Sequence, residues 1–521
     1  MNSNLRQDNP RIRWWPATII LLLDIGIVGW LWVFFSGIRQ ERMLGTLIVQ
    51  VVTLLLLGIW LLFGSRLRWK IRLTTFAGLA ISLTLFFFLF PFKEFTGDLV
   101  PTFGWRWAEK SYQTETVDLN SKSETDKLLT ATVFSYPQFL GPDRNGKTRG
   151  TRLDTDWSAQ PPKQLWKQPI GEGASSFAIS GNSAVTQEQR ADDEMVVCYD
   201  LKSGKTRWQH SDKARFDSVA FVGGIGPKAT PTISGNRVYT LGATGILNCM
   251  NLKDGKLIWS KNILNENNAV VIEWGMTGSP LLLDSLVVVS AGGTDGRSLV
   301  AYHRNSGEQI WSAGNDRAGY SSPLIATIAG VRQILIFNWE YVAAHNPKTG
   351  KILWKFPWTG DTQRVAQPVV LPEDRVFITT GYGVGSKLIK INQDTNGNLS
   401  PVLLWESNRM KAKFSNVIAV GEFIYGLDDG ILACIDLQEG KRQWKRGRYG
   451  HGQMILVDNL LLITTEKGDV VLVEPNPEQH KELARFSAIK GKTWNNPALA
   501  GPYLLVRNGQ EAACYKLPVL N

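Results

Sequence analysis

The sequence predicts an all-β protein, an eight-bladed β-propeller of four-stranded antiparallel blades, preceded by three transmembrane α-helices. Two observations carry this prediction. Three apolar runs open the chain of 521 residues, and each has roughly the 20 residues that cross the hydrocarbon core of a bilayer as a helix. Behind them, a strand–turn–strand pattern recurs to the C-terminus at intervals of about 40–50 residues, a repeat length typical of stacked arrays or propellers.

The apolar runs define a membrane anchor over residues 1–92, with helices expected at about 14–35, 43–63 and 73–92. Three closely spaced spans are not the pattern of a cleavable signal peptide. Asp24 lies inside the first run, and an acidic residue within a span is by default a candidate functional site. The alternative, which we favour, is that Asp24 is protonated or reaches water near the helix bundle.

The orientation of the anchor follows from its basic flanks. The N-terminal tail and the loop between the second and third runs carry Arg6, Arg11, Arg13, Arg66, Arg68, Lys70 and Arg72. The first loop carries only Arg39 and Arg42, next to Glu41. By the positive-inside rule we expect a multi-pass protein of the cytoplasmic (inner) membrane with a cytoplasmic N-terminus. Residues 93–135 are then an extracytoplasmic linker, and the propeller lies on the periplasmic side.

The repeat is clearest in residues 246–259, ILNCMNLKDGKLIW, which read as a strand, a tight turn and a second strand ending on Trp259. Gly255 in the turn supplies the positive φ that a short hairpin needs, and the indole is suited to packing against a neighbouring sheet. In this frame, Gly lies four residues before Trp, and a small residue lies ten residues before the same Trp. It recurs at 195–208, 298–311, 341–354 and 431–444.

A second apolar hairpin lies between successive frames, so one unit is a four-stranded meander. Third strands are expected to begin near residues 195, 246, 298, 341, 387, 431, 470 and 511. The matching fourth-strand aromatic residues are Trp166, Trp208, Trp259, Trp311, Trp354, Trp405, Trp444 and Phe486. No strands precede Trp166, and no Trp follows the strand at 511–517, so residues 163–170 are expected to complete the last blade. This closure removes open sheet edges, and the predicted propeller domain covers residues 136–521.

Cysteine positions and net charge exclude several functions. Cys198, Cys249, Cys434 and Cys514 occupy the small-residue position of four repeats. Equivalent positions in different blades are too far apart for a disulfide, so we interpret these cysteines as small buried core residues. The net charge of +11 is concentrated in the membrane flanks, and no basic run is interleaved with aromatic residues as in single-strand binders. We therefore expect no nucleic-acid partner.

The residue that opens each inner strand is expected to face the mouth of the central channel. All eight such residues are polar: Ser176, Thr230, Ser279, Ser322, Gln367, Ser415, Gln453 and Asn496. One interpretation is a ring of hydrogen-bonding groups around a ligand. The alternative is that inner-strand ends are wet in any propeller, so that their polarity serves no ligand.

Larger groups precede this ring in the sequence: Glu172, Arg215, Asp217, Glu273, Trp274, Tyr320, Arg364, Lys413, His451 and Trp494. Cations and aromatic rings around a concave mouth suit a planar or anionic ligand, or a protein segment. The two longest interblade loops, 209–229 and 260–278, are expected on the same face. The sequence has no G-x-S-x-G elbow, P-loop or H-E-x-x-H motif. We therefore assign no catalytic residue and no metal ligand.

The frame A/C-x-D/N-x-x-x-G-x-x-x-W resembles the tryptophan-docking motif of the PQQ-like propellers. That family includes quinoprotein alcohol dehydrogenases and a lipoprotein scaffold of outer-membrane protein assembly. The segments YPQFLGPDRNGK (136–147), GEGASSFAIS (171–180), ARFDS (214–218) and GYSSP (319–323) resemble a membrane-anchored bacterial subgroup of the family. The motif is specific for the fold, which hosts unrelated functions.

The resemblance implies two alternative functions. In the quinoprotein alcohol dehydrogenases, PQQ lies in the channel over a calcium ion held by Glu, Asn and Asp, beneath a ring of two adjacent cysteines. This chain has no adjacent cysteines. Glu172, Asn496 and Asp217 are types that bind calcium, but no motif assigns them to that role.

We therefore expect an extracytoplasmic binding or scaffold module that requires no cofactor. Its partners would be the lipid bilayer and an exported protein, peptide or small ligand on the propeller face. The alternative is a PQQ-dependent membrane dehydrogenase that oxidises alcohols or sugars. A third possibility is that the spans join a larger membrane complex and the propeller senses its surroundings.

Overall fold

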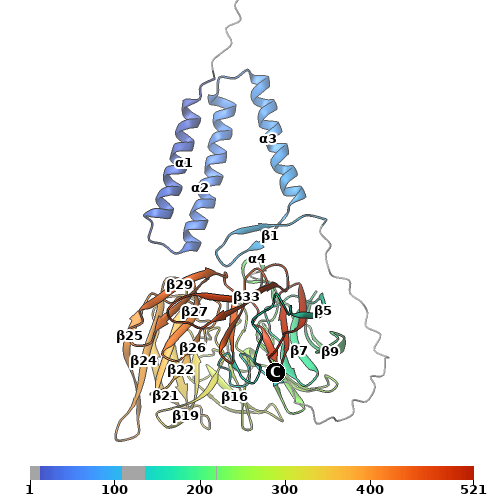
Figure 1. Ribbon diagram of the computed structural model, residues 1–521, viewed down its shortest axis with the longest axis vertical. Coiled ribbons are helices and arrows are strands. Elements are labelled where there is room, and N and C mark those ends of the chain that lie inside the picture. Colours follow the sequence, from blue (N-terminus) through green and yellow to red (C-terminus); the bar gives the residue numbers. More distant parts are fainter. Residues whose placement is uncertain (1–11, 108–134, 219, 521) are drawn as a thin grey trace, which may run out of the picture. The chain divides into compact units, whose positions relative to one another are not determined.

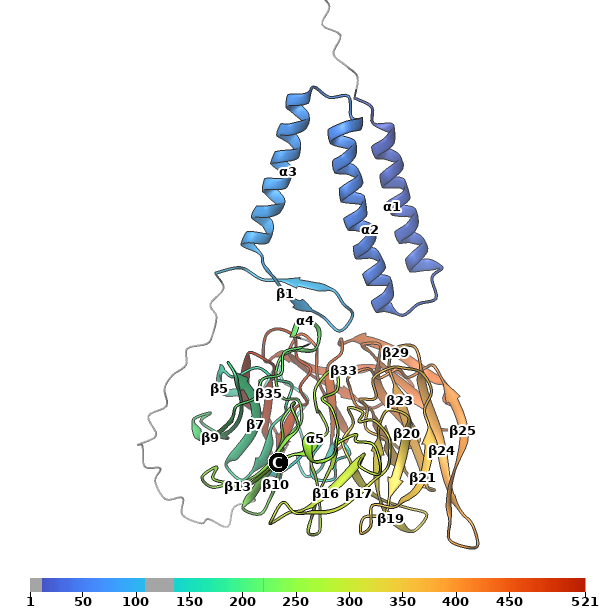
Figure 2. The ribbon, with the colours of Figure 1, turned by 180° about the vertical axis from the view of Figure 1, so that it is seen from behind.

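The structure is a computed structural model that describes residues 12–107, 135–218 and 220–520. The chain divides into two compact units, Met1–Lys110 and Ser111–Asn521. Figures 1 and 2 show long helices in the first unit and a ring of β-sheets in the second. Arg6, Arg11 and most of the expected linker lie outside the described residues.

Three helices make up most of the first unit: α1 (Trp15–Val33), α2 (Arg39–Ile59) and α3 (Trp69–Leu89). A π-helical turn, η1 (Trp60–Gly64), continues α2. All three helices are long and apolar enough to cross a membrane, and they lie where the sequence predicts spans. Few of their side chains are buried within the unit, which is typical of helices that face lipid.

Asp24 of α1 is hydrogen-bonded to α2. Gln50 Nε2 donates to both carboxylate oxygens of Asp24, at 3.0 and 3.2 Å. Thr53 Oγ1 donates to Asp24 Oδ1 at 2.9 Å. An unsatisfied carboxylate is costly in hydrocarbon, whereas polar contacts between helices stabilise their pairing. Asp24 therefore has structural partners on the neighbouring helix.

The first part of the expected linker forms a hairpin. Strand β1 (Phe92–Phe95) pairs antiparallel with β2 (Pro101–Phe103), and Phe92 lies opposite Phe103. From the sequence we assign this stretch to the linker and predict no hairpin in it, and the two strands have only four and three residues. So short a pair shows little alternation, and an isolated hairpin is marginal without a surface to pack on.

The second unit is the predicted eight-bladed propeller of four-stranded antiparallel sheets. First strands of neighbouring blades lie next to one another around the ring, so the chain runs from the inner to the outer strand of each blade. Blade 1 contains β6 (Ala178–Ser180), β7 (Ser183–Arg190), β8 (Asp193–Asp200) and β9 (Thr206–Asp212). Blade 2 contains β10 (Thr232–Ser234), β11 (Arg237–Leu241), β12 (Ile246–Asn251) and β13 (Leu257–Asn262). Blade 3 contains β14 (Leu281–Leu283), β15 (Leu286–Ser290), β16 (Leu299–His303) and β17 (Gln309–Ala313).

The next four blades follow the same order. Blade 4 contains β18 (Leu324–Ile328), β19 (Val331–Phe337), β20 (Tyr341–His345) and β21 (Ile352–Pro357). Blade 5 contains β22 (Val369–Leu371), β23 (Arg375–Thr380), β24 (Gly385–Gln393) and β25 (Leu399–Ser407). Blade 6 contains β26 (Ile418–Val420), β27 (Phe423–Asp428), β28 (Ile431–Asp436) and β29 (Arg442–Arg448). Blade 7 contains β30 (Gln453–Val457), β31 (Leu460–Thr464), β32 (Asp469–Glu474) and β33 (Lys481–Ser487).

The last blade is closed by the start of the unit, as predicted. Strands β34 (Ala498–Ala500), β35 (Tyr503–Arg507) and β36 (Glu511–Lys516) are completed by β5 (Lys163–Pro169). Cys514 lies opposite Trp166 in this pairing. The ring therefore has no open sheet edge between its first and last blades.

The tryptophan of each frame packs on the next blade. Trp208 Nε1 donates to Leu252 O at 2.7 Å, and a Cβ on Gly255 would lie 2.5 Å from Trp208 Cε3. The same close approach joins Trp166 to Gly204, Trp259 to Gly307, Trp311 to Gly350 and Trp405 to Gly440. These five glycines have φ between +66° and +73°. Glycine is thus required both by the turn and by the ring that covers it.

The small residue of the frame leaves room for this tryptophan. Cys198 lies opposite Trp208, and Cys249 lies opposite Trp259. All four cysteines are buried and none is in a disulfide, which confirms the interpretation from the repeat. Burial raises the pKa of the Cys198 and Cys514 thiols to about 12, so neither is a reactive thiolate at neutral pH.

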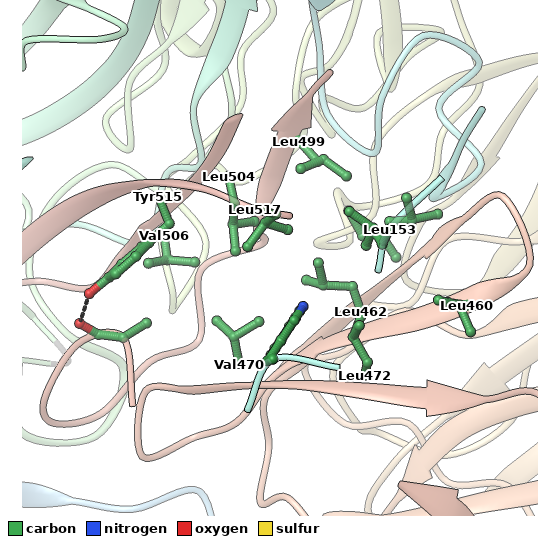
Figure 3. Close-up of a cluster of buried hydrophobic side chains, with 14 of the residues drawn as sticks. Leu153, Leu460, Leu462, Val470, Leu472, Leu499, Leu504, Val506, Tyr515 and Leu517 are labelled. Carbon is green, nitrogen blue, oxygen red and sulfur yellow. Dashed lines mark hydrogen bonds between the residues drawn. The ribbon is translucent and has the colours of Figure 1, made fainter. Parts of the chain in front are cut away.

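Blade 7 departs from the expected frame. A register shift places Ala484 opposite Leu472, at the tryptophan position, whereas Phe486 lies two residues later, opposite Val470. Phe486 still packs towards blade 8, with its ring centroid 4.8 Å from Tyr515 and 5.3 Å from Trp157. Figure 3 shows the buried cluster here, in which Leu153 joins leucines of blades 7 and 8.

The propeller also holds a segment of its own chain inside the ring, residues 135–150, which we call the channel segment. Strand β3 (Ser135–Tyr136) pairs with β6, and β4 (Lys147–Thr148) pairs parallel with β30. Both additions are on inner strands, so these sheets have five strands. The channel segment therefore lies within the central channel.

Candidate binding face of the propeller

The eight polar residues at the starts of the inner strands form a belt that links neighbouring blades. Seven are buried and Asn496 is half-buried. Thr230 N donates to Ser279 Oγ at 2.9 Å, Ser279 N donates to Ser322 Oγ at 2.9 Å, and Ser322 N donates to Gln367 Oε1 at 3.1 Å. The polarity of these positions thus has a structural use, because the side chains of Ser279, Ser322 and Gln367 each accept from a backbone N–H of the adjacent blade. Between blades 5 and 6 this part is played by Asn416, the neighbour of Ser415, which accepts from Gln367 N at 2.9 Å.

The belt continues around the rest of the ring. Gln453 Nε2 donates to the carbonyl oxygens of Phe414 and Trp494, at 2.7 and 2.9 Å. Ser176 Oγ donates to Asn496 O at 2.6 Å. Among the described residues, two buried acceptors of the belt, Gln453 Oε1 and Asn496 Oδ1, have no hydrogen-bond partner. Most of the belt is therefore committed to joining blades rather than directed at a ligand.

The channel segment closes the channel beneath the belt. It pairs with the last residues of β6 and β30, so it enters and leaves at the end opposite the belt. Its Arg144 is buried and donates to Ser279 O at 2.8 Å and to Pro280 O at 3.0 Å. Burial lowers the pKa of Arg144 to about 9. The guanidinium thus reaches the belt from the far side, and the channel is not an open passage.

Beyond the belt lie the interblade loops and the turns between second and third strands. Short helices α4 (Ala220–Gly223) and α5 (Ile263–Glu266) lie in the two longest loops. Arg215 and Asp217 are exposed and pair with each other at 2.8 Å. Glu172 is half-buried, and its backbone bridges to Gln189. In this part of the face, the charges of Arg215 and Asp217 therefore neutralise each other.

Blades 3 to 5 bring together two phenols and a carboxylate. Burial is the main cause that raises the pKa of Tyr320 and Tyr382, and the carboxylate of Glu273 adds to both shifts. Tyr320 is buried, whereas Trp274 and Tyr382 are half-buried and Glu273 is exposed. Tyr382 has a φ of +56°, a costly conformation for a bulky residue that is found where the surroundings hold it.

Arg364 does not project from the face as expected. It is 1% exposed, and its guanidinium donates to the carbonyl oxygens of Gly360 and Thr362 within its own loop. Burial lowers its pKa. Its guanidinium lies 4.9 Å from the centre of the Trp339 ring, and Arg317 lies 3.9 Å from the same ring. We correct the expectation accordingly: Arg364 holds its own loop.

The other half of the face carries a row of aromatic side chains, Tyr382, Phe414 and Trp494, which we call the aromatic row. The Phe414 centroid lies 4.9 Å from that of Trp494 and 6.3 Å from that of Tyr382. His451 is buried and lies 5.3 Å from Phe414. All three rings of the row are half-buried. Three loops and one turn, from four different blades, thus converge on one apolar strip.

Cations and one carboxylate surround the aromatic row. Lys413 Nζ lies 5.6 Å from the Tyr382 ring, and Lys492 Nζ lies 4.5 Å from the Trp494 ring. Glu466 Oε1 accepts from Trp494 Nε1 at 2.9 Å, and Oε2 accepts from His451 N at 3.2 Å. The indole is therefore fixed in place while its face stays next to a cation.

Exposed bases lie around this row, on loops and turns at Arg409, Lys467 and Lys490 and near the end of β29 at Arg446 and Arg448. The nearby acids are largely engaged. Asp428 pairs with Lys411 at 2.7 Å and with Lys445 at 2.6 Å. Glu511 pairs with Lys167 at 3.1 Å. The sector around the aromatic row is therefore positively charged and favours an anionic partner.

Sequence reasoning found Lys413, His451 and Trp494 but missed Phe414, Tyr382 and Glu466. One signal for Phe414 was present. The residue just before each belt residue is small or polar in the other seven blades, and only blade 6 places a Phe there. Tyr382 and Glu466 lie on turns between second and third strands, and nothing in the repeat frame indicates that these turns meet the interblade loops.

The residues that could hold calcium-bound PQQ do not form a donor set. Asp217 is ion-paired at the exposed rim, Glu172 lies on a different loop, and Asn496 belongs to the belt. Within the described residues, no three His, Cys, Asp or Glu side chains are grouped so as to hold a metal ion. The channel segment occupies the channel itself. The side chains present therefore do not fit this cofactor.

Comparisons with known proteins support the fold and the repeat. A family profile described as outer membrane protein assembly factor BamB matches residues 192–446. The protein of that name from Shewanella oneidensis is 22% identical over 306 residues, which cover 54% of this chain and 70% of the relative. The one from Burkholderia pseudomallei is 24% identical over 199 residues, 37% of this chain and 47% of the relative.

Solved structures share the propeller at lower identity. BamB from Moraxella catarrhalis aligns with a TM-score of 0.50 and 15% identity, over 68% of this chain and 98% of its own. A quinohemoprotein alcohol dehydrogenase from Pseudomonas putida HK5 aligns with a TM-score of 0.56 and 11% identity, over 74% of this chain and 81% of its own. At such identities the likeness is one of fold. The repeat frame, the eight closed blades and the profile match over residues 192–446 together support the PQQ-like β-propeller family for this chain.

Proposed function

We propose that this chain is a membrane-anchored binding or scaffold module whose propeller faces the extracytoplasmic side of the inner membrane. Three helices of spanning length precede the propeller, and their basic flanks favour a cytoplasmic N-terminus. The relatives named as outer membrane assembly factors support a role in holding other proteins. We propose that the partner is an exported protein, bound at the aromatic row.

The observation that carries this proposal is the aromatic row with its flanking cations. Phe414 and Trp494 are partly exposed, and Trp494 is held by Glu466 at 2.9 Å. A rigid aromatic ring loses little entropy on binding, which is why Trp and Tyr dominate binding hot spots. Lys492 and the basic loops add attraction for acidic groups. An extended segment that carries aromatic and acidic residues fits this chemistry.

The quinoprotein alternative has less support. It needs calcium ligands and room for a planar cofactor within the ring. Asp217, one of the candidate ligands, is already ion-paired with Arg215, and Arg144 of the channel segment contacts the belt. We therefore place binding on the outer face rather than in the channel.

A photo-crosslinking amino acid placed in the full-length membrane-bound chain tests the proposal. Position 414 lies in the aromatic row, and the control position, Lys348, is exposed on a turn at the opposite ends of the strands. We expect a defined extracytoplasmic protein to be crosslinked from position 414 and not from position 348. Equal crosslinking from both positions would contradict the proposal.

Two substitutions then separate binding from folding. Trp494→Ala removes one ring of the aromatic row, and Lys492→Glu reverses the charge beside it. We expect either change to weaken crosslinking of the same protein, with the circular dichroism spectrum unchanged, whereas Lys348→Glu has no effect. Truncation of a hot-spot residue costs about 2 kcal/mol or more, which is a loss of affinity of roughly thirtyfold.

The dehydrogenase alternative is tested directly by titrating the purified chain with PQQ and calcium. Our proposal predicts no saturable binding and no dye-linked oxidation of alcohols or sugars. Saturable binding accompanied by turnover would establish the alternative and overturn the scaffold proposal.

A further inference from the structure

The residues that follow the third helix fold back along its end and expose large aromatic rings. Phe103, Trp105 and Trp107 are 40%, 47% and 59% exposed. Trp105 lies 5.3 Å from Phe90, and Trp107 lies 6.0 Å from Phe88, between ring centroids. Tryptophan is enriched where a membrane span leaves the hydrocarbon, because its ring is apolar and its N–H is polar.

The same stretch satisfies the open end of α3. Arg106 N donates to Leu89 O at 2.8 Å, and Arg106 Nε donates to Phe88 O at 2.7 Å. Gly104 N donates to Pro91 O at 3.1 Å. The last carbonyl groups of a helix have no partners within the helix, and they are costly to leave unpaired near lipid. Arg106 therefore caps the helix at the point where the chain emerges.

The hairpin is also tied to the start of α2. Arg39 Nε pairs with Asp98 Oδ2 at 2.8 Å, and Gln40 Nε2 donates to Gly97 O at 2.7 Å. Because consecutive spans are antiparallel, the start of α2 and the end of α3 lie on the same side of a membrane that they cross. Contacts to both ends therefore hold the hairpin at the level where the spans leave the hydrocarbon.

We propose that residues 92–107 lie in the phospholipid headgroup layer of the membrane that α3 crosses. The inference rests on the proposed anchoring and not on partner binding. The aromatic rings occupy the boundary with the acyl chains. Lys93 is exposed, and its stem lies directly over Gly104, which is two residues before the capping Arg106. These two cations suit lipid phosphates, which attract basic groups next to a span. The partner is thus the bilayer surface itself.

Depth measurements on the full-length chain in lipid nanodiscs test this inference. The four native cysteines are buried, so a single introduced cysteine takes an environment-sensitive fluorophore selectively. Trp107→Cys and Lys93→Cys report on the hairpin. Leu83→Cys, on the lipid-exposed side of α3, marks the hydrocarbon, and Lys348→Cys marks water.

We expect emission from the labels at positions 107 and 93 to lie at wavelengths between those of the two reference labels. Nitroxide groups near the headgroups should quench both labels more strongly than nitroxides deep in the acyl chains. The label at position 348 should be quenched by neither. Labels at 93 and 107 that behave like the one at 348 would overturn the inference, and so would stronger quenching by deep nitroxides. A label at position 83 that resists deep quenching would instead refute the anchoring.

Discussion

The packing of each tryptophan on the glycine of the next blade makes a quantitative prediction for Gly255→Ala. Gly255 has a φ of +72°, and an added Cβ would lie 2.5 Å from Cε3 and 2.7 Å from Cδ2 of Trp208. The left-handed conformation costs alanine about 1 kcal/mol. Overpacking a filled site costs a further ~1–3 kcal/mol. We therefore expect Gly255→Ala to destabilise the propeller by about 2–4 kcal/mol.

Gly235→Ala in the same blade is the matched control. Gly235 also lies in a turn with positive φ, +58°, but an added Cβ there would have nothing within 4 Å. Its expected cost is the conformational part alone, about 1 kcal/mol. Urea denaturation of both variants, followed by circular dichroism, measures the difference. Equal losses in the two variants would refute the reasoning, because the ring of Trp208 would then impose no constraint.

Three further predictions concern closure, the helix pair and pH. Trp166→Ala removes a buried ring and its hydrogen bond to Leu201 O at 2.9 Å, so we expect a loss of about 3–5 kcal/mol in urea denaturation; a loss below 1 kcal/mol would argue against closure through β5. Asp24→Ala leaves Gln50 and Thr53 without their partner, so the stability measured by thermal unfolding in detergent should fall by roughly 1–2 kcal/mol. Asp24→Asn should keep most of this stability, and equal stability of the two variants would contradict a structural role for Asp24. Burial raises the pKa of Glu194 to about 7, above its unfolded value. Its contribution to stability is therefore full below about pH 4.5 and is lost as the pH rises to 7. Glu194→Gln should remove this decline in stability, and a pH profile unchanged by the substitution would contradict the prediction.

The fold could be predicted because the residues that pack neighbouring blades together recur at fixed positions in the repeat frame. Gly255 and Trp259 are fixed by a turn and by an interblade contact that recur in most blades, and so their spacing is visible in the sequence. The pairing of β5 with β36 followed from counting strands, since Trp166 was left without a preceding sheet. Cys514 was identified as a core residue by its position in the same frame.

The other features of the structure depend on contacts between residues that do not recur at regular intervals in the sequence. The belt residues are polar, as expected, but only the structure shows that Ser279 and Gln367 satisfy backbone donors of adjacent blades. The channel segment pairs with two inner strands through a few residues at each end, which is too short to show alternation. Arg364 reads as an exposed cation in the sequence, although its loop folds around it.

The binding face could be predicted only in part, because only some of its residues have positions that can be counted from the repeat. Residues just before the inner strands could be placed by counting, and so Trp494 and Lys413 were found. Tyr382 comes from a turn whose position relative to those loops depends on how neighbouring blades are rotated. Its contact with Phe414, at 6.3 Å between ring centroids, joins two blades. Such contacts depend on the three-dimensional arrangement of the blades and produce no regular spacing in the sequence.

The claim on which the functional account depends is that the channel is filled by the protein's own chain, which leaves the outer face for partners. Hydrogen–deuterium exchange of residues 135–151 in the full-length protein tests it most directly, with the exposed turn at 394–398 as the internal reference. The account predicts slow exchange, comparable to that of the adjacent inner strands, because Gly146 N donates to Leu140 O and Thr151 N donates to Asp458 Oδ2, both at 3.0 Å. Exchange as fast as that of the reference turn would contradict it and would return the channel to consideration as a ligand site.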